Sequence, residues 1–200
     1  MANRAYLYAA RKDFKKIRDL SEAKYPIPLA YKILLGVDTE LCNSELWNYE
    51  QPIAIRANME KGLERLYEFY EYLETQPNIN RTAIITYKKE ARDFFKKHSD
   101  RVMEYFFLEV GEIFDMTADI TPIETQNKAL FDEINNIAAD IVDILEKKPA
   151  RLFNYKTSPW LLELQKDAIA LSCYWTHVTF YSFNKSGKRT QIRKAKDSDS

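Results

Sequence analysis

The sequence predicts a small α+β domain in which a mainly antiparallel sheet packs against about four helices. Three observations support this fold class. Residues 105–108 (YFFL) form an unbroken apolar run, which is typical of a strand covered on both faces. Apolar residues recur at the helical period in long segments that follow residues 58 and 122. Apolar residues make up 46% of the 200 residues, so the chain can form a sizeable core.

In the first quarter of the chain, short elements are expected. Residues 5–10 (AYLYAA) predict a strand. The highly charged residues 11–24 fit either a short surface helix or an ordered loop. Residues 29–36 (LAYKILLG) are too short for periodicity to choose between strand and helix. Residues 43–51 indicate a loop or a helical turn, and residues 53–56 (IAIR) predict a second strand.

Helix signals are clearer further along. Asn58 is a favourable N-cap residue and starts the first long helix, and a second helix with a basic side covers residues 82–98. Residues 121–124 (TPIE) match a capping box with proline at the first helical position, which predicts the start of a third helix. The last helical pattern covers residues 158–175, and residues 177–183 predict a closing strand.

Residues 104–116 (EYFFLEVGEIFDM) lie at the centre of the predicted sheet. A lone glycine in a strand often marks a bulge, so Gly111 predicts either a bulge or a turn between two strands. Glu109, Glu112 and Asp115 suggest an acid–base pair or a divalent-metal site, as in a metal-dependent hydrolase. The simpler interpretation is three solvent-facing carboxylates. Because no second motif supports an enzyme, we assign no catalytic residue, no metal site and no cofactor.

Cysteine and histidine are scarce in this chain. Cys173 and His177 are four residues apart and would share one face of a helix. A structural zinc ion needs four ligands, so Cys42 and His98 would have to complete such a site from distant parts of the sequence. We therefore expect buried thiols and ordinary imidazoles.

Composition limits the function and location. We expect one domain at residues 1–184, followed by a basic, disordered tail at residues 185–200. The formal net charge is zero, which argues against a nucleic-acid binder. No stretch has the length and apolarity of a signal peptide or a membrane helix, so we expect a cytoplasmic protein without a membrane partner. The tail cations are Lys185, Lys188, Arg189, Arg193, Lys194 and Lys196.

A row of carboxylates marks the first long helix. Its members are Glu60, Glu64, Glu68 and Glu71. Such a row is either a solvated helix face or an acidic surface that steers a basic protein partner. The 13 tyrosines and three tryptophans favour the second interpretation, because these residues are enriched at interfaces. We predict these four residues, with Glu109 and Glu112, as the partner-binding surface.

Three stretches carry a resemblance to other proteins. They are residues 1–8 (MANRAYLY), residues 27–34 (IPLAYKIL) with residues 52–55 (PIAI), and residues 105–114 (YFFLEVGEIF). They resemble an uncharacterised bacterial family with the motifs Met-Ala-Asn-Arg-x-Tyr-Leu-Tyr and Tyr-Phe-Phe-Leu-Glu-x-Gly-Glu-Ile-Phe. The resemblance spans residues 1 to about 116. Because the family has no established activity, the resemblance implies no functional residue.

Three functions remain open from the sequence. Small bacterial proteins without catalytic motifs often resemble immunity proteins, so the leading hypothesis is a protein-binding module that inhibits a toxin domain by covering it. The second is the metal-dependent hydrolase at Glu109, Glu112 and Asp115. The third is a structural subunit of a larger assembly, which would expose an apolar patch of several hundred Å².

Overall fold

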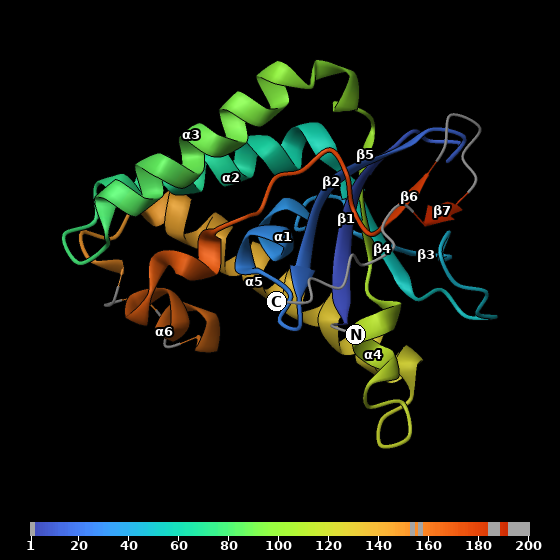
Figure 1. Ribbon diagram of the computed structural model, residues 1–200. Coiled ribbons are helices and arrows are strands. Elements are labelled where there is room, and N and C mark those ends of the chain that lie inside the picture. The colour runs from blue at the N-terminus through green and yellow to red at the C-terminus, as the bar shows by residue number, and fades with distance from the viewer. Residues whose placement is uncertain (1–2, 153–154, 156–157, 184–188, 192–200) are drawn as a thin grey trace, which may run out of the picture.

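A computed structural model describes residues 3–152, 155, 158–183 and 189–191 (Figure 1). The strands are β1 (Arg4–Ala10), β2 (Ile17–Lys24), β3 (Glu40–Cys42), β4 (Ala54–Asn58), β5 (Tyr105–Glu109), β6 (Tyr181–Phe183) and β7 (Arg189–Gln191). The helices are α1 (Leu29–Leu34), α2 (Met59–Glu74), α3 (Arg81–Lys97), α4 (Gly111–Asp115), α5 (Ile123–Lys147) and α6 (Pro159–Lys166), with 3-10 helices η1 (Ser99–Arg101) and η3 (Ala168–Leu171).

Five strands form one antiparallel sheet in the order β2-β1-β5-β4-β3, and β6 pairs with β7 in a separate antiparallel pair. The predicted α+β class is therefore confirmed. In Figure 1, α2 and α3 lie side by side, while β6 and β7 stand apart from the helices. The apolar run that indicated a central strand becomes β5, which pairs with β1 on one side and β4 on the other.

The two faces of the sheet have different covers. Side chains alternate along a strand, so neighbouring residues point to opposite faces. Leu7 and Leu108 belong to the main core, which includes buried residues of α1, α2 and α5. Tyr8 and Phe107 belong to a second cluster on the other face, where Phe183 of β6 lies 5.2 Å from the Tyr8 ring. The sheet is thus buried on both sides, as the continuous apolar run of β5 predicted.

The segment after β5 differs from the prediction. Gly111 is neither a bulge nor a turn between strands, because it is the first residue of α4. A Cβ atom at Gly111 would lie 2.9 Å from the ring of Trp47, which is closer than real Cβ contacts come. The glycine therefore serves the close packing of Trp47 against the start of α4, and Phe114 is buried as a helical residue.

The charged residues 11–24 also differ, since they contain β2 instead of a surface helix or a loop. Strand β2 pairs with β1 along its length, with a register shift between Leu7 and Tyr8. Phe14, Ile17 and Leu20 are spaced as on a helix, yet Ile17 and Leu20 lie in β2. Pairing with β1 outweighs that local pattern, because strand propensity depends on packing and neighbours. The open choice at residues 29–36 is settled as helix α1.

The predicted helix starts were partly correct. Asn58 caps α2 as expected, and its side chain accepts the backbone N–H of Lys61 at 3.1 Å. The capping box at residues 121–124 is not formed, because α5 begins at Ile123 and Pro122 occupies the cap position without a side-chain hydrogen bond. Instead, Gln126 closes the turn by donating to the carbonyl of Thr121 at 2.7 Å.

At the carboxyl end, α6 begins with proline after Ser158 as predicted but ends at Lys166, where η3 follows after one residue. The predicted closing strand at residues 177–183 contains β6. Within the predicted tail, Arg189–Gln191 form β7. The other tail cations, Lys185, Lys188, Arg193, Lys194 and Lys196, lie outside the described residues. None of the helices in the described part has the length and apolarity needed to cross a membrane.

Candidate functional site

The acidic ridge lies along the solvent side of α2. It comprises Glu60, Glu64, Glu68 and Glu71, which are all exposed. The opposite side of α2 is fixed in the core by Leu66 and Phe69. A Cβ atom at Gly62 would lie 2.2 Å from the carbonyl oxygen of Leu34, so α1 and α2 meet backbone to backbone there. The ridge therefore belongs to a helix that tight packing holds in place.

The two ends of the ridge differ in their ion pairs. Glu71 lies 3.0 Å from the Arg92 guanidinium and 4.0 Å from the Lys88 ammonium, both on α3. Glu74, one turn further, also pairs with Lys88. Among the described residues, no cation pairs with the other three members of the ridge. The basic side of α3 thus neutralises the carboxyl end of the ridge and leaves the amino end open.

A groove of about 680 Å³ lies beside the ridge, and we name it the α2–η1 groove. Leu63 and Tyr67 of α2 form part of its apolar floor, together with Val102 and Met103, which connect η1 to β5. Val102 is 48% exposed. The groove residues supply no cation, because the only charged ones are the four glutamates of the ridge.

The apolar floor was not predicted from the sequence. The apolar residues that recur at the helical period after residue 58 include Leu63 and Tyr67, and the structure leaves both half-buried. Val102 and Met103 lie between η1 and β5, in a segment without a periodic pattern. Only the folded chain brings them beside α2, so no sequence signal was available.

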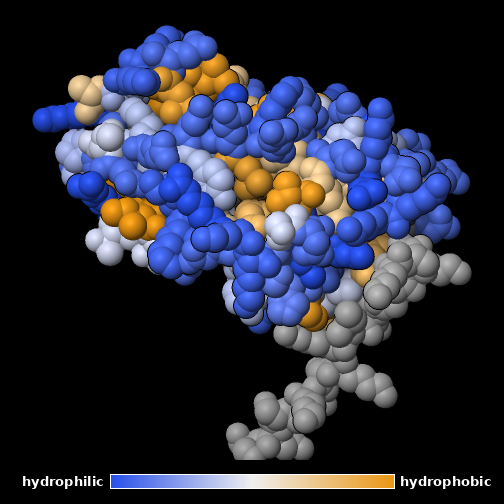
Figure 2. Space-filling model, turned by 90° about the horizontal axis from the view of Figure 1, so that it is seen from above, coloured by the Kyte–Doolittle hydropathy of each residue, from blue (hydrophilic) through white to orange (hydrophobic). Residues whose placement is uncertain are grey.

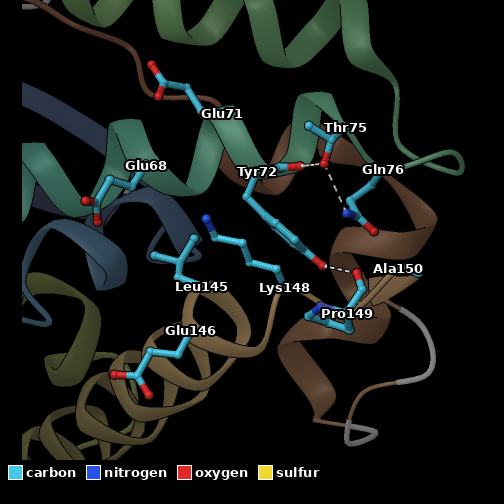
Figure 3. A pocket seen from close by; sticks show the side chains of 10 residues that line it. All are labelled: Glu68, Glu71, Tyr72, Thr75, Gln76, Leu145, Glu146, Lys148, Pro149 and Ala150. Carbon is cyan, nitrogen blue, oxygen red and sulfur yellow. Dashed lines mark hydrogen bonds between the residues drawn. The ribbon is translucent and has the colours of Figure 1, made fainter.

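A second hollow of about 710 Å³ shares Glu68 and Glu71 and lies between α2 and the end of α5 (Figure 3). The Tyr72 hydroxyl donates to the carbonyl of Pro149 at 3.0 Å, which ties the turn after α5 to α2. Lys148 has a left-handed backbone (φ 41°), and Figure 3 shows its side chain reaching toward α2. This hollow therefore contains its own cation, unlike the α2–η1 groove.

The prediction that Glu109 belongs to a binding surface is wrong. Its side chain is fully buried at the end of β5. The Ser44 hydroxyl donates to its Oε2 at 2.8 Å, and the backbone N–H groups of Glu45 and Leu46 donate to its Oε1 at 2.6 and 3.1 Å. Burial raises the pKa of Glu109 to about 8, although these hydrogen bonds act in the opposite direction. The carboxyl group anchors residues 43–51 to the sheet and cannot reach a partner.

Glu112 and Asp115 occupy different environments from Glu109. Glu112 is half-buried and accepts the Tyr6 hydroxyl at 3.0 Å and the Arg4 backbone N–H at 3.1 Å, whereas Asp115 is exposed. Burial, followed by the nearby Glu112 charge, raises the pKa of Tyr6. Across the described residues, no three His, Cys, Asp or Glu side chains come together as metal ligands would. The hydrolase hypothesis therefore has no convergent acidic site in this part of the chain.

Cys173 and His177 do not share a helix face, because α6 ends before them. Cys173 is buried with its thiol 3.4 Å from the Ser21 hydroxyl, and burial raises the pKa of the thiol to about 12. The His177 ring stacks on His98, with 5.3 Å between the ring centroids. Burial also raises the pKa of Cys42 to about 12. Both thiols stay protonated at neutral pH, which makes them poor nucleophiles.

The profile of a domain of unknown function (DUF7822) matches residues 6–150. The chain belongs to this family. The match includes the acidic ridge, the α2–η1 groove and the Glu109 anchor, and it continues beyond residue 116, where the sequence resemblance ended. Helix α6, η3 and β6 lie outside it. No curated protein and no solved structure matches the chain.

The surface that carries α3 has a different character. Figure 2 looks down on this face and shows apolar colour in separate patches within mainly hydrophilic surface. Ile85 on α3 is 43% exposed, and exposed single apolar residues of this kind are normal in monomeric proteins. The structural-subunit hypothesis stays a prediction.

Proposed function

We propose that the protein is a protein-binding module that uses the acidic ridge to bind a basic surface of another protein. Its most concrete form is an immunity-type inhibitor that neutralises a toxin domain by covering it. The observation that carries the proposal is the row formed by Glu60, Glu64 and Glu68, which are exposed and have no ion pair from the described residues.

A row of unpaired like charges can raise the rate of association with a basic partner. Fixed charges of one sign attract a partner of opposite sign from a distance and raise the association rate, and this effect falls as salt increases. Like charges at i and i+4 also repel each other by a few tenths of a kcal/mol per pair. A basic partner would remove that repulsion on binding.

The test compares two variants that lose the same number of negative charges. The ridge variant combines Glu60→Gln, Glu64→Gln and Glu68→Gln. The control variant combines Glu90→Gln, Glu124→Gln and Asp132→Asn, which replace three exposed carboxylates that have no ion pair among the described residues. Wild-type protein is used to capture the partner from its native lysate, and the association rate of the purified partner is then measured at low and high salt.

We expect the ridge variant to associate at least about tenfold more slowly than wild type at low salt. The control variant should change the rate by less than about threefold, since its charges lie away from the interface. Equal rates for the two variants would contradict the proposal. The inhibitor form further requires that coexpression of wild type, but not of the ridge variant, protects cells against the captured partner.

A further inference from the structure

Building on the proposed function, we propose that the α2–η1 groove receives a basic amphipathic helix of the partner. The apolar side of that helix would cover Leu63, Tyr67, Val102 and Met103, while its lysine or arginine side chains would face the ridge. The juxtaposition of an exposed apolar floor with an acidic rim carries this inference.

Charge complementarity indicates that the segment bound in the groove is positively charged. Four glutamates border the α2–η1 groove, and three of them lack an ion pair among the described residues. The neighbouring hollow is lined by Glu68, Glu71 and Glu146 but also by Lys148, which offsets part of their negative charge. The α2–η1 groove is therefore the better of the two for a cationic segment. The acidic rim would repel a nucleic acid.

The apolar floor favours a helical conformation of the bound segment over an extended one. The backbone of an extended segment placed on this floor would leave N–H and C=O groups without partners, which is costly when water is excluded. A helix satisfies its own backbone groups and can present an apolar side to the floor. Between α2 and the link from η1 to β5, the groove residues belong to no strand edge that could add another strand.

The groove is also held in shape before any partner binds. The Arg92 guanidinium lies 5.2 Å from the centre of the Tyr67 ring and pairs with Glu71, so it orders the α2 side of the floor. The backbone N–H of Met103 lies 3.2 Å from the Met59 sulfur, which ties the other side of the floor to the start of α2. Such order reduces the conformational entropy lost on association.

The test uses two fluorescently labelled peptides of identical composition, rich in leucine, lysine and alanine. In the first, leucines occupy one helical face and lysines border it at i, i+4 and i+8. In the second, the same residues are scrambled so that both peptides have equal charge but only the first is amphipathic. Binding is measured by fluorescence anisotropy for wild type, the ridge variant and Val102→Glu, whose folding is checked by circular dichroism.

We expect wild type to bind the amphipathic peptide at least about tenfold more tightly than the scrambled one, and the peptide to gain helicity on binding. Val102→Glu should remove most of this preference, because it places a charge on the apolar floor. Equal binding of the two peptides would overturn the helix inference while leaving the proposed function intact. Binding that is unchanged in the ridge variant would instead contradict the proposed function itself.

Discussion

The amino end of the acidic ridge and the carboxyl end of β5 both carry glutamate, but in opposite environments. Glu64 is exposed and has no ion pair among the described residues, whereas Glu109 is fully buried and accepts hydrogen bonds from three donors. A buried carboxyl group whose oxygens accept hydrogen bonds within the fold contributes to that fold. One whose oxygens face water is available to a partner. Burial therefore separates an acid that serves the fold from one that is available for the proposed binding, although both belong to the surface predicted from the sequence.

The largest expected effect is the loss of the Glu109 anchor. Glu109→Ala would leave the buried donors of Ser44, Glu45 and Leu46 without an acceptor and would open a cavity beneath residues 43–51. We expect the free energy of unfolding to fall by about 2–4 kcal/mol, measured by urea denaturation. Glu64→Ala is the matched exposed control and should change it by less than about 0.5 kcal/mol. Similar values for both variants would erase the distinction between the two regions.

Stability should also depend on pH through Glu109. The pKa of Glu109 is about 8 in the folded protein, whereas a glutamate in an unfolded chain has a pKa of 4.5. Between these two pH values, the folded protein holds a proton that the unfolded chain has lost. The bound proton therefore stabilises the folded protein fully below pH 4.5, and this contribution is lost as the pH rises to about 8. The free energy of unfolding should fall by a few kcal/mol over this range.

Glu109→Gln tests this dependence, because a neutral amide keeps an acceptor for the loop donors at every pH. Its free energy of unfolding should decline less than that of wild type between pH 5 and 8. Parallel pH profiles for the two proteins would mean that Glu109 is ionised throughout this range.

Local patterns predicted those parts of the fold that local interactions determine. Strand β1, the Asn58 cap and helix α3 depend on short-range periodicity, and each lies within about one residue of the expected position. Strand β2 depends on pairing with β1, and the start of α4 at Gly111 depends on the ring of Trp47, which is distant in sequence. No local pattern contains such information.

The candidate site shows the same division. The helical spacing of the four ridge glutamates predicted correctly that they share one exposed face of α2. Which of them are paired depends on α3, since Arg92 reaches only Glu71. The burial of Glu109 depends on residues 43–51 closing over the end of β5, and the groove floor depends on the position of Val102. The pairing, the burial and the groove floor could be seen only in the folded chain.

A smaller effect is expected for the Tyr6–Glu112 hydrogen bond. Tyr6→Phe removes a hydroxyl that donates to Glu112 at 3.0 Å but leaves the ring in its aromatic cluster. Glu112 keeps the Arg4 N–H as a donor, so the loss should be about 1 kcal/mol in the free energy of unfolding. A loss above about 3 kcal/mol would show that Glu112 is as important to the fold as Glu109 is.

The smallest effect on stability is expected for the ridge variant, whose three glutamates carry the binding proposal. In the ridge variant, removal of two repulsive i, i+4 pairs favours α2, whereas loss of the Glu60 charge from the first helical turn weakens its interaction with the helix dipole. These contributions oppose each other, so the free energy of unfolding should change by less than about 0.5 kcal/mol, and added salt should narrow any difference from wild type. A loss of more than about 2 kcal/mol would mean that the three carboxylates stabilise the folded chain. They would then belong with Glu109, and the observation that carries the binding proposal would be lost.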